Sequence, residues 1–279
     1  MRIDLHTHST ASDGTLSPAA VVHDAARSGL DVVALTDHDT IAGWAEATEA
    51  AHQAGIALVR GVEISCRTPQ ASVHLLGYLH DPDHAGLAAS LERARSARAR
   101  RAVAITELVA RDFPITWHDV VEATPPGATV GRPHIADALV KAGVVVDRDV
   151  AFAEILATGG PYDLPYDVPT PSELIRLVRE AGGVPVLAHP FASVRGATLT
   201  EADIAELAAV GLMGLEVDHR DHTEDDRGRL RALARDLNLM VTGSSDFHGA
   251  GKRNRLGENV TSPEVFAALE AAGYLEVIR

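Results

Sequence analysis

Short apolar, β-branched segments alternate with helical patterns along most of this chain, and this alternation restricts the possible folds more than any other feature. Seven strands are expected, at residues 3–6, 31–36, 56–64, 73–79, 184–189, 213–217 and 239–243. The helices between them begin at capping residues, several of which are followed by proline: Ser17-Pro18, Thr40, Thr170-Pro171, Thr200 and Ser262-Pro263. Strands that alternate with helices favour a parallel sheet with right-handed crossovers. Seven such units predict an α/β barrel of the TIM-like, (β/α)7 kind.

One stretch interrupts the alternation, because residues 87–169 contain no convincing strand. A long helical pattern, LAASLERARSARARRAVAITELVARD, is followed there by shorter helical patterns. We interpret residues 87–169 as a helical insertion after the fourth strand, and residues 1–86 and 170–279 as the barrel. An insertion at that end of a barrel commonly covers or shapes the site. Its arginines, from Arg93 to Arg101, are interpreted as a solvated helix face in preference to a nucleic-acid stripe.

Charge and composition exclude several classes of protein. The net charge of −14 argues against stable binding of duplex nucleic acid. It does not exclude a phosphorylated substrate, because divalent metal ions reverse the sign of charge inside a small site. No apolar run approaches the ~18–20 residues of a membrane-spanning helix, and we expect no secretory signal. The single cysteine, Cys66, rules out an intrachain disulfide, so a cytoplasmic protein without a membrane partner is expected.

Histidines and carboxylates recur where the expected strands end. In a strand that includes His6 and His8, the period of two places both imidazoles on one face. The full set of candidates is His6, His8, Asp13, His38, Glu63, His74, His189, Asp246 and His248. Taken singly, each has a structural alternative, such as a hydrogen-bonded core position for His74. Their shared position at one end of the barrel is what predicts a metal site.

The mixture of donor types indicates which metals and which reaction to expect. Imidazoles combined with carboxylates suit zinc, manganese or iron(II). Nine ligands exceed the needs of one ion, so two or three ions that share a bridging carboxylate are expected. Adjacent ions ~3.5–4 Å apart activate a water and hold both oxygens of an in-line displacement. Hydrolysis of a phosphate ester follows from this arrangement better than redox or acyl-transfer chemistry does.

Five motifs resemble those of the polymerase and histidinol phosphatase (PHP) superfamily: LHTHSTASDG, ALTDHDT, GVEIS, VLAHP and SDFHG, in this order. The resemblance implies a distorted (β/α)7 barrel with a trinuclear metal centre. Carried onto this chain, it implies that His6, His8, Glu63 and Asp246 hold one ion. It implies that Glu63 bridges to a second ion, held also by His74 and His189, and that Asp13, His38 and His248 hold the third. We therefore expect three divalent ions, with manganese first and zinc or iron(II) as alternatives, and a metal-bridging hydroxide as the nucleophile.

Further motifs resemble the branch of this superfamily that acts on nucleotides, namely GRPHIADALV, GLEVDHRDHTEDD and SSDFHGAGKR. That branch includes 3′,5′-nucleoside bisphosphate phosphatases and 5′-to-3′ exoribonucleases. The resemblance implies that Arg132 and His134 reach a substrate phosphate, and that His222 contacts the phosphate or protonates the leaving oxygen. Asp218 and His219 stand where relatives tend to carry an aromatic residue, which removes a base-stacking contact at that point.

The expected function is hydrolysis of a nucleoside 3′,5′-bisphosphate to the 5′-monophosphate and phosphate, with short 5′-phosphorylated RNA as related chemistry. One alternative is a phosphatase of histidinol phosphate or another small molecule. A second is a non-catalytic module that senses nucleotides. A third, an amidohydrolase, is disfavoured because such barrels usually have a metal-ligating lysine on a later strand, and none is found here.

Overall fold

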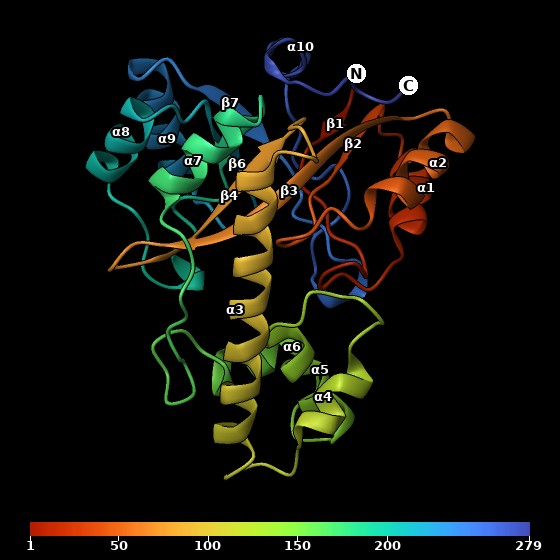
Figure 1. The fold of residues 1–279 in the computed structure, drawn as a ribbon, viewed down its shortest axis with the longest axis vertical. Coiled ribbons are helices and arrows are strands. Elements are labelled where there is room, and N and C mark those ends of the chain that lie inside the picture. The colour runs from red at the N-terminus through yellow and green to blue at the C-terminus, as the bar shows by residue number, and fades with distance from the viewer.

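The computed structural model describes the whole chain, Met1–Arg279, and its centre is one seven-stranded sheet whose strands follow the order of the chain (Figure 1). The strands are β1 (Ile3–Asp4), β2 (Val32–Leu35), β3 (Ala57–Arg67), β4 (Ser72–Tyr78), β5 (Val184–Leu187), β6 (Gly214–Asp218) and β7 (Met240–Gly243). A parallel bridge between Thr7 and Phe247 brings the first and last strands together, so the sheet is a nearly closed barrel. The predicted α/β barrel of seven strands is confirmed.

The direction of β4 differs from the prediction of an all-parallel sheet, which was wrong at this strand. β4 runs antiparallel to both β3 and β5, whereas the other neighbouring pairs are parallel. Only residues 68–71 connect β3 to β4, and a parallel connection needs a crossover of about a dozen residues or more. β3 also extends three residues beyond the expected end, to Arg67, because residues 61–67 are paired with β4 in this hairpin.

Helices surround the sheet. They are α1 (Pro18–Arg27), α2 (Trp44–Ala54), α7 (Pro171–Glu180), α8 (Glu201–Ala209), α9 (Glu224–Asp236) and α10 (Pro263–Ala272). The expected caps Ser17, Thr170, Thr200 and Ser262 each accept a hydrogen bond from the first turn of their helix. Thr40, in contrast, does not cap a helix, since α2 begins four residues later. The preceding residue, Asp39, has φ of 56°, and its carboxylate accepts hydrogen bonds from the N–H and hydroxyl of Ser65. Residues 36–43 form the loop between β2 and α2, and α2 begins only after Gly43.

The apolar core has one layer inside the barrel and others outside it. Alternate residues of β1–β5, such as Ile3, Val32 and Val186, form the inner cluster, and Phe266 and Leu269 of α10 join it. Other residues of the strands pack outward against the helices. Since α10 and both termini lie at one end of the barrel, the other end is available for a site (Figure 1).

Five helical segments between β4 and β5 project from that other end (Figure 1). They are α3 (Ala85–Val109), α4 (Trp117–Ala123), α5 (Arg132–Lys141), α6 (Arg148–Val150) and η1 (Ala151–Ile155). No strand occurs between Tyr78 and Val184. The segments have an apolar core of their own, in which Ile105, Ile135 and Leu139 are fully buried. No helix of the chain is long and apolar enough to span a membrane.

Candidate metal centre

The nine candidate residues converge at the end of the barrel that faces the five helical segments. His6, His8 and Asp13 follow β1, and His38 follows β2. Glu63 and His74 lie within β3 and β4, His189 follows β5, and Asp246 and His248 follow β7. Seven of the nine are buried, and His74 and His189 are partly buried. The donor atoms of eight of them form three overlapping groups, to none of which His189 belongs: His8–Asp13–His38–His248, His6–His8–Glu63–Asp246, and His38–Glu63–His74.

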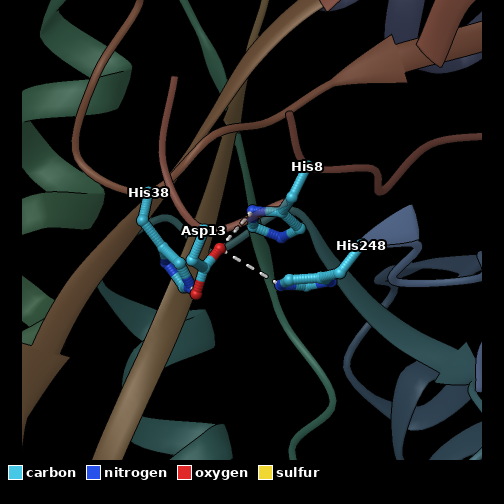
Figure 2. A group of neighbouring side chains, drawn as sticks. All are labelled: His8, Asp13, His38 and His248. Carbon is cyan, nitrogen blue, oxygen red and sulfur yellow. Dashed lines mark ion pairs between the residues drawn. The ribbon is translucent and has the colours of Figure 1, made fainter. Parts of the chain in front are cut away.

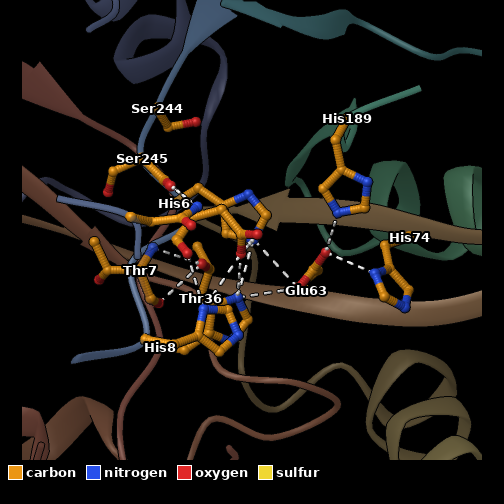
Figure 3. Close-up of polar contacts among 12 residues, drawn as sticks. His6, Thr7, His8, Thr36, Glu63, His74, His189, Ser244 and Ser245 are labelled. Carbon is orange, nitrogen blue, oxygen red and sulfur yellow. Dashed lines mark hydrogen bonds and ion pairs between the residues drawn. The ribbon is translucent and has the colours of Figure 1, made fainter. Parts of the chain in front are cut away.

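Glu63 is the centre of this arrangement, because its two carboxylate oxygens face different imidazoles. Oε1 lies 2.8 Å from Nδ1 of His74 and 3.1 Å from Nε2 of His189 (Figure 3). Oε2 lies 3.1–3.2 Å from the ring nitrogens of His6, His8 and His38. One carboxylate therefore reaches both sides of the cluster, which is the geometry that a bridging ligand requires.

Asp13 lies close to the imidazoles of His8, His38 and His248 (Figure 2). Its Oδ1 lies 3.3 Å from Nε2 of His248 and 3.7 Å from Nδ1 of His8, and its Oδ2 lies 3.7 Å from Nε2 of His38. Asp13, His38 and His248 form one group together with His8. His8 and His38 each belong to two groups.

Asp246 presents one oxygen to the cluster and the other to two cations. Its Oδ1 lies 3.4 Å from Nε2 of both His6 and His8. Its Oδ2 accepts hydrogen bonds from Arg195 at 2.7 Å and Lys252 at 2.8 Å. These two contacts fix the plane of the carboxylate and leave Oδ1 without a hydrogen-bond partner.

The backbone is strained at two of the candidate metal ligands that follow strands. His189 and Asp246 have φ of 29° and 53°. Such a conformation costs about 1–3 kcal/mol for a non-glycine residue and persists where the surrounding structure imposes it. Two of the candidate ligands are therefore aimed into the cluster by main-chain geometry that is unfavourable in itself.

Unpartnered buried atoms show that the residues fit a bound cation. Nδ1 of His38, Nδ1 of His74, Nε2 of His248 and Oδ1 of Asp246 are buried and make no hydrogen bond. Nε2 of His6 and Nε2 of His8 lie 3.0 Å apart. Buried polar atoms left without partners are costly, and they are rare in folded proteins unless an ion or water satisfies them. Imidazole nitrogens and carboxylate oxygens at this density match the ligand preferences of zinc, manganese and iron(II).

Protonation states also suit metal binding. Burial opposes ionisation of Asp13 and Glu63, but the surrounding histidines hold both pKa values well below their usual range. Burial lowers the pKa of His248 to about 4, with the Lys252 charge acting in the same direction. At His8, burial is outweighed by the nearby carboxylates of Asp246, Glu63 and Asp13, which raise its pKa to about 9. The cluster therefore carries ionised carboxylates that attract cations, and a metal ion bound there would displace the proton from His8.

Glu216, in the middle of β6, contacts two of the candidate ligands, His6 and His189, without being one itself. It was not identified from the sequence. Its Oε1 lies 2.9 Å from Nδ1 of His6, and its Oε2 accepts a hydrogen bond of 2.8 Å from the main-chain N–H of His189. It is fully buried, and its pKa is lowered because the charges of His6 and other histidines outweigh burial. The signal in the sequence was a lone glutamate within an apolar strand.

Replacing Glu216 should weaken the cluster without removing a ligand. Carboxylates that orient a metal-bound histidine typically contribute 10–100-fold in metal affinity or activity. We expect Glu216→Gln to raise the manganese concentration that gives half-maximal activity by roughly that factor. The control is Glu180→Gln, at the exposed end of α7. An unchanged metal requirement in Glu216→Gln would contradict this role.

Three further residues were expected to contact the substrate, and they differ in position. Arg132 lines the cavity beside the cluster, and its Nη1 lies 3.4 Å from the carbonyl oxygen of Leu156. His134 is 1% exposed, and its Nδ1 accepts a hydrogen bond of 3.1 Å from the N–H of Gly131 at the start of its own helix. The side chain of His134 thus caps α5, a role that the sequence did not indicate.

The expectation for His222 requires a correction. Its Nδ1 donates to the carbonyl oxygen of Val217 at 2.8 Å, and its Nε2 accepts from the N–H of Phe191 at 3.1 Å. Both ring nitrogens are therefore committed to main-chain groups, and neither is free to bind a phosphate or protonate a leaving oxygen. His222 instead ties the loop after β5 to the loop after β6.

A cavity of about 800 Å³ lies beside the cluster. Five of the candidate ligands form part of its wall: Asp13, His38, His74, His189 and His248. Nine cationic side chains also line it: Arg67, Arg98, Arg101, Arg132, Arg148, Arg195, Arg220, Lys252 and Arg253. Because the wall holds only four aspartates, it is cationic in a chain whose net charge is −14. The cavity is therefore suited to an anionic ligand.

Most of these cations are paired with carboxylates. The pairs are Arg98–Asp39, Arg101–Asp163, Arg148–Asp137, Arg195–Asp221, Arg220–Glu258, Lys252–Asp246 and Arg253–Asp149. Arg67 and Arg132 have no carboxylate partner, and their hydrogen bonds are contacts of 3.4–3.5 Å to neutral oxygens. The guanidinium of Arg132 also lies over the ring of Phe152, 5.6 Å from its centroid. Burial and the nearby charge of Arg101 lower the pKa of Arg132 to about 10, which leaves it charged at neutral pH.

The five helical segments are attached directly to the loop that carries Asp13. Arg148 donates two hydrogen bonds of 2.6 Å to Asp137 and a third, of 2.9 Å, to the carbonyl oxygen of Asp13. The N–H of Thr129 donates to the carbonyl oxygen of Ala11 at 3.0 Å. The cavity wall and the cluster are thus joined into one unit by both side-chain and main-chain contacts.

Comparisons with known proteins agree with this geometry. The model of the PHP domain matches residues 4–118. A 5′-3′ exoribonuclease of Haemophilus influenzae is 36% identical over 93% of this chain and 94% of its own length. A 3′,5′-nucleoside bisphosphate phosphatase of Chromobacterium violaceum is 34% identical over 91% of this chain and 89% of its own. A crystal structure from Bifidobacterium adolescentis, assigned to the metal-dependent phosphoesterases, superposes with a TM-score of 0.95 at 42% identity, covering 97% of this chain and 96% of the other.

Proposed function

This chain belongs to the PHP-domain family and is a metal-dependent phosphoesterase, and from that premise we propose that it removes the 3′-phosphate of a nucleoside 3′,5′-bisphosphate to leave the 5′-monophosphate. The observation that carries the proposal is the cationic cavity of about 800 Å³ that opens onto the cluster. Relatives that cover about nine-tenths of the chain act on a nucleoside bisphosphate or on RNA, as their names state. Short 5′-phosphorylated RNA is the related substrate.

We assign three divalent ions to the cluster, with manganese as the first choice. His6, His8, Glu63 and Asp246 would hold the first, and Glu63, His74 and His189 the second. Asp13, His38 and His248 would hold the third. His38 also lies close to Glu63 and His74, so it is positioned between the second and third sites. When bound, divalent ions neutralise the phosphoryl oxygens and lower the pKa of a water molecule.

Residues beside the cluster would bind the substrate and hold its phosphate toward the metal site. Arg132, which has no carboxylate partner, is available to form two parallel hydrogen bonds to the oxygens of the reacting phosphate. Arg195 and Lys252 keep Asp246 directed at the cluster through its Oδ2. The helical segments, held to Asp13 by Arg148, cover the cluster and restrict the entry of water.

Phosphate release by the purified protein with added manganese tests the proposal. Adenosine 3′,5′-bisphosphate is compared with 5′-AMP, histidinol phosphate and a 5′-phosphorylated dinucleotide, each with a chelator control. We expect release from the bisphosphate to be fastest and to stop in the chelator. Turnover of histidinol phosphate or 5′-AMP alone would assign the site to another small phosphomonoester. Binding of the bisphosphate without any turnover would indicate a nucleotide sensor.

A further inference from the structure

Arg67 is a cation of the cavity wall whose bonding capacity is largely unused. A guanidinium carries five N–H donors, yet the single hydrogen bond of this one runs from Nε to the carbonyl oxygen of Thr68, at 3.4 Å. Of the nine cations that line the cavity, only Arg67 and Arg132 lack a carboxylate. Arg132 already has a place in the proposed function, whereas Arg67 does not.

The register of β3 and β4 places Arg67 on the wall that carries the metal cluster. Glu63, Ser65 and Arg67 alternate along β3 and so share one face. Across the strand pair, His74 lies opposite Ser65, and Ser72 lies opposite Arg67. The Cα of Arg67 is therefore ~13 Å along the strand from that of Glu63, outward from His74. Arg67 and Ser72 form the outer part of the wall, and both line the cavity.

The contacts of Arg67 give its side chain no structural task. Its main-chain N–H donates to the carbonyl oxygen of Pro169 at 3.2 Å and so joins the hairpin to the segment that follows the helical region. That contact does not involve the guanidinium. A charged side chain kept on a partly buried wall without a partner points to a ligand that supplies the opposite charge.

We propose that Arg67 binds the second phosphate of the substrate, the one that is not hydrolysed. The inference rests on the proposed function, in which the reacting phosphate lies at the cluster and Arg132. For a nucleoside bisphosphate the group at Arg67 is the 5′-phosphate, and the hydroxyl of Ser72 adds a donor beside it. Arg67 thereby determines specificity, because it separates substrates with two phosphates from simple phosphomonoesters.

Paired substrates that differ by one phosphate provide the kinetic test. For Arg67→Gln we expect the KM for adenosine 3′,5′-bisphosphate to rise about tenfold to a hundredfold, the usual effect of losing a charge-assisted hydrogen bond. The KM for adenosine 3′-monophosphate should stay within twofold, because that substrate lacks the second phosphate. Arg67→Lys should recover part of the loss, since lysine keeps the positive charge but cannot form two parallel hydrogen bonds as a guanidinium does. The matched control is Arg93→Gln, which removes an exposed arginine of α3 that is paired with Glu173 outside the cavity.

Equilibrium binding of 5′-AMP tests the same contact without turnover. Calorimetric titration should show that the parent protein binds 5′-AMP more tightly than adenosine, and that Arg67→Gln loses this difference. Equal losses for both substrates, or an unchanged affinity for 5′-AMP, would overturn the assignment of Arg67. Absence of phosphate release from every nucleotide in the parent protein would instead contradict the proposed function, and the titration would still decide the role of Arg67.

Discussion

Glu63→Gln is expected to lower kcat/KM for phosphate release by about a thousandfold, the upper end of what removal of one electrostatic group at an active site costs. The amide keeps the size of the side chain but loses its charge, and its NH₂ group turns a donor toward nitrogens that would have to ligate metal. Both oxygens of Glu63 face imidazoles, Oε1 toward His74 and His189 and Oε2 toward His6, His8 and His38. The substitution therefore affects every ion that the carboxylate bridges. Steady-state phosphate release in saturating manganese measures the effect.

Two comparisons separate this loss from misfolding. Glu206→Gln, on the exposed face of α8, removes the same charge at a distance from the cluster and should retain the parent rate. Circular dichroism should show the same helix content in both variants. Metal analysis should find fewer ions in Glu63→Gln than in Glu206→Gln. A Glu63→Gln protein with full activity and a full metal content would contradict the bridging role.

The sequence was informative about the strands because each strand is a compact β-branched run between helices with clear caps. All seven strands lie where these runs were found. The reversal of β4 also had a signal, since only eight residues separate the expected strands 56–64 and 73–79. That separation is too short for a helical crossover and long enough for a hairpin. The length of this connection therefore indicates the reversal, which the alternation of strands and helices alone does not.

The cluster could be predicted because its residues occupy equivalent positions, next to strand ends on one side of the barrel. The supporting residues do not share this property. Glu216 lies within β6, where a glutamate in an apolar strand has no distinguishing neighbour in the sequence. The partners of His222 are main-chain groups of Val217 and Phe191, and the second of these lies 31 residues away. Such contacts depend on how two loops meet, which periodicity and motifs do not encode.

Removal of the metal ions is expected to abolish turnover and to lower the midpoint of thermal unfolding. Without ions, the cluster leaves His38, His74, Asp246 and His248 with buried atoms that lack partners. A ligand present at a hundred times its dissociation constant stabilises a folded protein by about 2.7 kcal/mol. At roughly 2–4 °C per kcal/mol for a chain of this size, chelation should lower the midpoint by about 5–10 °C. Differential scanning calorimetry with and without a chelator measures the shift, and added manganese should restore both stability and activity.

The same scan on Glu63→Gln tests whether the stabilisation arises at the cluster. If the ions stabilise the protein by binding there, a variant with a damaged bridging ligand has less to lose, and chelation should shift its midpoint by less than that of the parent. Glu206→Gln should show the full shift, since its substitution lies outside the site. A shift of equal size in all three proteins would place the stabilising ions elsewhere on the chain. A reduced shift together with lost turnover in Glu63→Gln alone would tie stability and catalysis to one carboxylate.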